Sequence, residues 1–103
     1  MVVGSKRVKL PKIAKTVTAT IVQRSSGAVT SVLEVEEGTT WADIDGMEVS
    51  SGVYVWAYSD GYVRISNGLH AGMAIGISKD KTATKSTVLN TDVIEETTYY
   101  ALI

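Results

Sequence analysis

The chain has 103 residues, a formal net charge of −1, no cysteine, one proline and one histidine, and its length corresponds to a single domain with a modest core. The lack of cysteine excludes disulfides, thiolate nucleophiles, cysteine-ligated zinc and iron–sulfur clusters. No apolar run approaches the roughly 20 residues of a membrane-spanning helix, and residues 1–7 hold no signal-peptide stretch, so we expect the protein in the cytoplasm or in a virion and away from membranes.

The composition indicates β structure. Val, Ile and Thr make up 34 of the 103 residues, and these β-branched types favour strands over helices. Short alternating apolar runs are separated by Gly, Ser, Asn and Asp, and no long window shows a helical period. We therefore predict a mainly β fold: a small antiparallel or mixed sheet, or a barrel, built on two hairpins with at most one short helix.

Residues 1–15 carry five cations and no acid. The cations are Lys6, Arg7, Lys9, Lys12 and Lys15. Apolar residues interrupt them, which favours an extended segment that docks on a neighbouring subunit, and residues 34–48 hold six acids that could complement it. Two alternatives remain: a solvated arm that protects a sheet edge, and a nucleic-acid-binding arm, which the lack of interleaved aromatics disfavours. We assign 1–15 as a basic arm and 16–103 as one β-rich domain.

The first predicted hairpin covers residues 16–36. Thr16 to Gln23 and Val29 to Glu36 both alternate in polarity. A three-residue loop at residues 26–28 pairs Ile21 with Leu33 and Ala19 with Val35, which places the apolar residues on one face. The opposite face, exposed to solvent or to a partner, is then Thr18, Thr20, Val22, Val32 and Glu34.

A short helix is predicted at residues 40–45. Thr39 or Thr40 can act as the N-cap, with an acid three residues later as in a capping box. Trp41 and Ile44 then lie on one helical face, and Asp45-Gly46 ends the helix early.

The second predicted hairpin covers residues 53–66. A two-residue turn at Asp60-Gly61 pairs Trp56 with Ile65. This register places Tyr54, Trp56, Tyr58, Val63 and Ile65 on one face, opposite Val53, Val55, Ala57, Tyr62, Arg64 and Ser66. Neither face is fully polar, so the hairpin is either covered on both sides within the fold or buries one face against another chain. Further strands are predicted at residues 73–78, 84–89 and 97–102.

Residues 16–78 resemble ubiquitin-like β-grasp domains of the small sulfur-carrier type. The resemblance lies in the segment Leu33 to Ile44, with its Gly38-Thr39-Thr40, and in Val53-Tyr54-Val55 followed by Asp60-Gly61 and by residues 69–75. It implies a β-grasp-like fold. The chain ends in Leu102-Ile103 where those carriers have a reactive Gly-Gly, so the resemblance does not extend to their conjugation chemistry.

No catalytic or metal-binding motif is found in the sequence. His70 lies in a predicted turn with no acid beside it to orient it. In residues 43–48, glycine comes too early for a calcium-binding EF-hand loop. We therefore expect a protein that is not an enzyme and that uses no cofactor or metal.

Small size, β-rich composition and a basic segment beside an acidic one suggest a structural assembly subunit. By organisation alone the chain is similar to tailed-phage capsid decoration (cement) proteins, which implies docking on capsid subunits or on further copies. The alternative is a β-grasp adaptor that binds a protein partner through a sheet face. Trp, Tyr and Arg dominate interface energetics. The expected interface residues are Lys6, Arg7, Lys9, Lys12, Lys15, Trp56, Tyr62, Arg64, Tyr99 and Tyr100.

Overall fold

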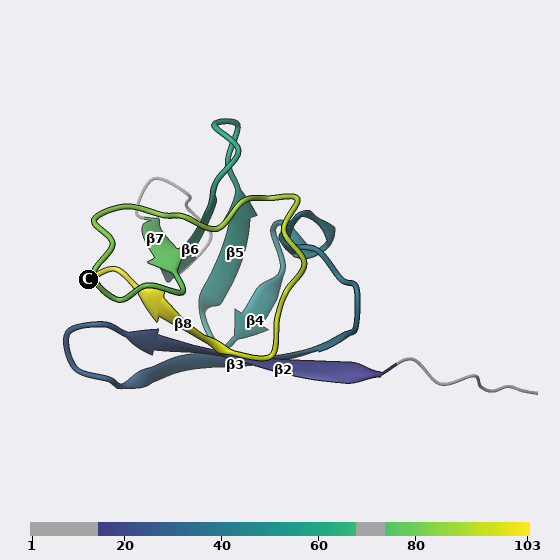
Figure 1. Ribbon diagram of the computed structural model, residues 1–103, viewed down its shortest axis with the longest axis horizontal. Helices are drawn as coiled ribbons and strands as arrows, with labels where there is room; N and C mark the ends of the chain where they lie inside the picture. The colour runs from purple at the N-terminus through teal and green to yellow at the C-terminus, as the bar shows by residue number, and fades with distance from the viewer. Residues whose placement is uncertain (1–14, 68–73) are drawn as a thin grey trace, which may run out of the picture.

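The structure, a computed structural model, describes residues 15–67 and 74–103. Its strands form one seven-stranded sheet, in the order β3-β2-β8-β7-β6-β5-β4, that curls until it is nearly closed into a barrel (Figure 1). The elements are β2 (Thr16–Gln23), β3 (Val29–Glu36), η2 (Trp41–Ile44), β4 (Glu48–Ser50), β5 (Val53–Ala57), β6 (Val63–Asn67), β7 (Ile75–Ser78) and β8 (Thr98–Ala101). The prediction of a small, mainly β sheet is confirmed.

Strand β8 joins two parts of the sheet. On one side lies the β2–β3 hairpin, and on the other the antiparallel run from β4 to β7. β8 pairs in parallel with β2 and antiparallel with β7. Residues 79–97, which connect β7 to β8, contain no strand and contribute Val88 and Ile94 to the core.

The first hairpin forms, but its predicted register is wrong by two residues. Ala19 pairs with Leu33 and Val17 with Val35, and a bulge follows Ile21. The loop has four residues, because the N–H of Gln23 donates to the carbonyl of Ala28 at 2.8 Å. A shift of two residues preserves the faces of both strands, so the predicted inward set remains inward.

The short helix is confirmed as a single 3₁₀ turn, Trp41–Ile44, with Thr40 as its N-cap. The Thr40 N–H donates to Asp43 Oδ2 at 2.9 Å, and the Asp43 N–H donates to Thr40 Oγ1 at 3.3 Å. These two hydrogen bonds form the predicted capping box. Both apolar residues of the turn, Trp41 and Ile44, are buried as expected.

The second hairpin also forms, with a register that differs by one residue from the prediction. Trp56 pairs with Arg64 and Val55 with Ile65. The loop spans residues 59–61, because the N–H of Tyr58 donates to Tyr62 O at 3.0 Å, and Gly61 adopts a φ of 95°. A three-residue loop with a left-handed residue is the next commonest hairpin connection after two-residue turns. A one-residue shift turns β6 over relative to β5, so the predicted faces are wrong.

The later strands are partly as predicted. β7 and β8 lie within the predicted ranges 73–78 and 97–102, while β4 was not anticipated. The predicted strand 84–89 is wrong: it holds only an isolated bridge from Leu89 to Tyr62. This segment instead lies against the ends of β6 and β7. The N–H of Thr87 donates to the carbonyl oxygen of Ile77 at 3.1 Å. The carbonyl oxygen of Val88 accepts from the N–H of Val63 at 2.9 Å.

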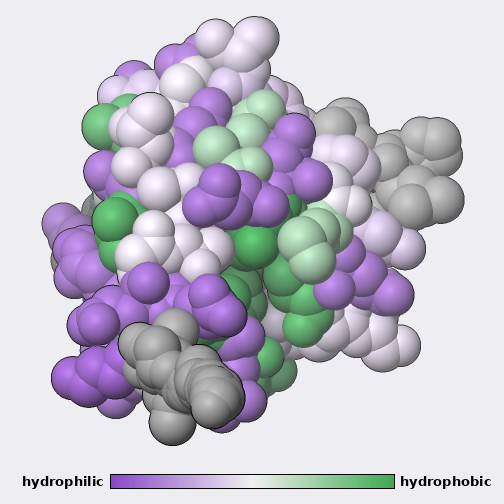
Figure 2. Space-filling model, turned by 90° about the vertical axis from the view of Figure 1, so that its right-hand side faces the viewer, coloured by the Kyte–Doolittle hydropathy of each residue, from purple (hydrophilic) through white to green (hydrophobic). Residues whose placement is uncertain are grey.

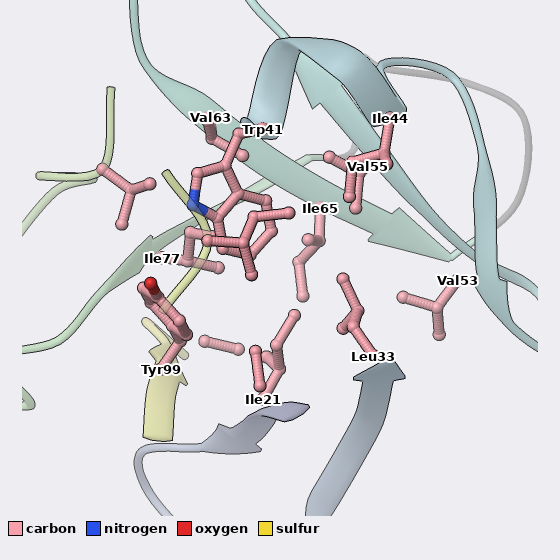
Figure 3. Packing of buried hydrophobic residues seen from close by; sticks show 14 residues of the cluster. Ile21, Leu33, Trp41, Ile44, Val53, Val55, Val63, Ile65, Ile77 and Tyr99 are labelled. Atoms are coloured by element: carbon pink, nitrogen blue, oxygen red, sulfur yellow. The ribbon is translucent and has the colours of Figure 1, made fainter. Parts of the chain in front are cut away.

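The core fills the barrel and is centred on two aromatic rings (Figure 3). Trp41 from η2 and Tyr99 from β8 meet edge to face, with ring centroids 5.1 Å apart. Aliphatic side chains from β2, β3, β5, β6 and β7 surround them. The Tyr99 hydroxyl accepts a hydrogen bond from the Glu95 N–H at 3.0 Å, which satisfies its polar end inside the barrel.

Burial of Tyr99 predicts a loss of stability at alkaline pH. Desolvation raises the pKa of its hydroxyl above the ordinary value of 10.0, because the tyrosinate is disfavoured inside the core. The folded state therefore holds its proton to higher pH than the unfolded state, and the free energy of unfolding falls as pH rises above 10.0. Tyr99→Phe should flatten this decline while losing about 1 kcal/mol at neutral pH with the Glu95 hydrogen bond. Urea unfolding of both proteins at several alkaline pH values measures this decline. The same dependence of the free energy of unfolding on pH in Tyr99→Phe and wild type would contradict the prediction.

Candidate functional site

The outer surface of the β5–β6 hairpin carries a cluster of aromatic side chains. The observed register places Tyr54, Trp56 and Tyr58 beside Tyr62 and Arg64, on the face opposite the buried Val53, Val55, Val63 and Ile65. We call Tyr54, Trp56, Tyr58, Tyr62 and Arg64 the aromatic face. Tyr62 is 38% exposed, and the other four are half-buried.

Arg64 lies across from Trp56 on this face and is held in place by a residue of the hairpin loop. Its two terminal nitrogens donate to the two carboxylate oxygens of Asp60, at 3.1 and 2.9 Å. Its guanidinium lies 4.4 Å from the centre of the Tyr58 ring, within the range of a cation–π interaction. The Arg64 hydrogen bond lowers the pKa of Asp60, and Asp60 in turn raises the pKa of Arg64. The guanidinium is thus charged, oriented and partly accessible.

Trp56, the cross-strand neighbour of Arg64, is held by contacts on the same face. Its ring stacks with Tyr54, with centroids 6.1 Å apart and planes inclined by 22°. Its indole N–H donates to the Ser66 hydroxyl at 2.5 Å. The aromatic side chains are therefore fixed before any partner arrives, which reduces the conformational entropy lost on binding.

A groove lies where the barrel is not closed by a strand ladder. The edge strands β3 and β4 contact one another, and two serine hydroxyls cross the gap: Ser31 donates to Val49 O at 3.4 Å, and Ser50 donates to Thr30 O at 3.2 Å. Beside this seam is a hollow of about 200 Å³. We call it the β3–β4 groove, and its lining is Val32, Leu33, Glu34, Val35, Ile44, Met47, Glu48 and Val49.

The β3–β4 groove is apolar with carboxylates at its border. Val32 and Met47 are large hydrophobic side chains that remain 55% and 52% exposed. Among the described residues, Glu34 and Glu48 are the charged members of the lining, and none of its members is a cation. Figure 2 looks onto the end of the molecule that holds η2, where hydrophobic side chains lie exposed between hydrophilic ones.

The predicted interface residues fall into separate groups. Trp56, Tyr62 and Arg64 come together on the aromatic face, although the predicted register had placed Trp56 opposite the other two. Lys15 is exposed immediately before β2. Tyr100 is half-buried on β8, and β7 separates β8 from the β6 strand of the aromatic face. Tyr99 is 1% exposed, because its strand turns it into the core rather than toward a partner. Lys6, Arg7, Lys9, Lys12 and His70 lie outside the described residues.

Sequence reasoning placed Val32 on the outward face of the first hairpin and Asp60 in the turn of the second, but it did not pair Asp60 with Arg64 and assigned no role to Met47. Asp60 read as a turn residue, and its contact with Arg64 depends on the loop length. Val32 and Met47 carried a usable signal, since each is a large apolar residue between polar neighbours.

Residues 15–67 and 74–103 hold no helix that is long and apolar enough to span a membrane. In the same part of the chain, no three His, Cys, Asp or Glu side chains gather as ligands for a metal ion. Comparison of the chain with protein-family models, with curated proteins and with solved structures finds no match.

Proposed function

We propose that the protein is a non-enzymatic structural assembly subunit, such as a phage capsid decoration protein, whose copies associate through the aromatic face. The observation that carries the proposal is the set of three tyrosines, one tryptophan and one arginine on the outer surface of a single hairpin. These residue types supply most of the binding energy at protein interfaces.

The geometry of the face suits a stable contact. Its side chains are held by stacking, by the Trp56–Ser66 hydrogen bond and by the Arg64–Asp60 pair, so association freezes few rotamers. Tyr62 offers the most accessible ring, beside an oriented guanidinium. This combination of flat rings and one fixed cation fits a protein surface that offers apolar area together with a carboxylate or carbonyl oxygens.

The test is the native mass of the full chain, measured by light scattering over a wide range of concentrations. We expect the wild-type protein to associate. The double variant Tyr62→Ser/Arg64→Ser should shift the association midpoint to at least about tenfold higher concentration, because each hot-spot side chain contributes about 1–2 kcal/mol. Circular dichroism checks that both proteins are folded.

A matched control alters an exposed residue of another strand. Val29→Ser alters a residue that is 62% exposed at the start of β3, outside the aromatic face, and it should leave the midpoint unchanged. A wild-type protein that is monomeric at every concentration would contradict self-assembly and favour the β-grasp adaptor alternative. Association that the double variant leaves intact would show that the contact lies elsewhere.

A further inference from the structure

We propose that the β3–β4 groove binds the basic arm of a second copy of the chain, through residues 7–12. This contact is separate from the aromatic face, and it is tested below in variants in which that face is weakened. It would give each subunit a donor segment and an acceptor groove, so that copies join head to tail.

The groove sets the chemistry of its occupant. Val32 and Met47 expose apolar surface to solvent, and the buried Leu33 and Ile44 form the floor. Glu34 and Glu48 border the hollow. Among residues 15–67 and 74–103, no cation joins the lining, and the two ion pairs, Arg64–Asp60 and Lys79–Glu95, lie elsewhere. The occupant should therefore combine apolar side chains with positive charge.

The size of the groove indicates a short extended peptide. Four consecutive residues of β3, 32–35, line one wall. At about 3.3 Å per residue in a strand, this wall is about 13 Å long. An extended segment of four to five residues matches that length.

The arm has the matching sequence. Arg7-Val8-Lys9-Leu10-Pro11-Lys12 alternates cations with apolar residues over its first four positions. In an extended chain, Val8 and Leu10 project to one side, with Lys12 after them on the same side, and Arg7 and Lys9 project to the other. The two apolar side chains can then enter the groove, while the long cationic side chains reach the carboxylates at its border.

The position of Lys15 favours an arm from a second copy. The carbonyl of Lys15 accepts from the N–H of Glu37, so the chain enters β2 beside the turn that follows β3. The groove lies on the other side of β3, which faces β4. The arm of the same molecule would have to pass around residues 37–40 to reach it, whereas the arm of a neighbour approaches without this obstacle.

The test mixes two full-chain variants that each keep one half of the contact. The ¹⁵N-labelled protein carries Lys9→Glu/Lys12→Glu and keeps the groove, and the unlabelled protein carries Glu34→Lys and keeps the arm. Both also carry Tyr62→Ser/Arg64→Ser, which weakens association through the aromatic face. We expect amide shifts in the labelled protein that saturate and that centre on Val32, Leu33 and Val49.

Two controls fix the interpretation. Unlabelled protein with the Lys9→Glu/Lys12→Glu arm should bind at least about tenfold more weakly, because two attractions become repulsions. Glu37→Lys added to the labelled protein replaces an acid with a cation outside the groove lining. It should leave the affinity for the wild-type arm within about twofold.

Each other outcome overturns the proposal. Absence of shifts at the groove, or shifts that arm reversal does not weaken, would rule out the arm as occupant. If dilute wild-type protein and the Lys9→Glu/Lys12→Glu variant already differ at the groove, independently of concentration, the arm docks within its own molecule. Association through the arm alone would persist in the Tyr62→Ser/Arg64→Ser variant, so the light-scattering test of the aromatic face rests on the shift that this variant causes.

Discussion

Replacement of Trp41 with alanine is expected to lower the free energy of unfolding by about 3–5 kcal/mol, the range for deletion of a large buried aromatic side chain. The side chain is fully buried and packs edge to face on Tyr99. The backbone of η2 also binds the β7–β8 connection, from Trp41 N–H to Asp92 O at 3.1 Å and from Ala42 N–H to Asn90 O at 2.9 Å. Loss of the indole therefore leaves a cavity where three parts of the chain meet.

Urea unfolding followed by circular dichroism measures this loss. Trp56→Ala is the matched control, since it makes the same chemical change on the half-buried aromatic face. Its effect should be clearly smaller, because the vacated space is open to water. An equal or larger loss for Trp56→Ala would contradict the assignment of Trp41 as the centre of the core.

Gly76→Ala should destabilise the protein by about 1–3 kcal/mol through overpacking. A Cβ at this position would lie 2.8 Å from the backbone nitrogen of Ser86, closer than real contacts allow. The Ser86 segment cannot move away easily, since its hydroxyl lies 2.6 Å from Val63 O and 3.0 Å from Ile77 O. The added methyl group thus pushes β7 away from the segment that lies against it.

The thermal midpoint and urea unfolding of Gly76→Ala provide the measurement. Removal of the Ser86 side chain in Gly76→Ala/Ser86→Gly should not restore stability, because the nearest atom belongs to the backbone. Wild-type stability for Gly76→Ala would show that the two segments are not packed so closely.

Local signals were sufficient for several of the elements but not for their pairing. The capping box of Thr40 and Asp43 and the alternation along β2, β3 and β5 are encoded by neighbours in sequence, and those elements form as predicted. Register depends on loop length, which Ser, Asp and Gly leave open. Both hairpin loops are one residue longer than predicted. The parallel pairing of β2 with β8 joins distant segments, and no local pattern indicates it.

In the candidate site, the error of one residue in the register of the second hairpin changed which side chains were predicted to lie together. Trp56, Tyr62 and Arg64 were chosen for their residue types, and the structure does bring them onto one surface. Their arrangement was not predictable from the two-residue turn, which would have put Val63 and Ile65 beside Trp56. The contact of Arg64 with Tyr58 exists only because Gly61 accommodates a φ of 95° and lengthens the loop.

The central position of β8 has a consequence for the time course of folding. Thr18 N–H donates to a carboxylate oxygen of Glu96, 78 positions later, and the β2–β8 ladder runs on from there. During synthesis, the β2–β3 hairpin and the β4–β7 strands emerge without the strand that unites them. The sheet can become continuous only after residues 98–101 have left the ribosome. Pairing β2 with β8 closes a loop of most of the chain, and such long-range pairing is slow. Before β8 pairs, the nascent chain exposes the unpaired edges of β2 and β7 to chaperones and to other nascent chains.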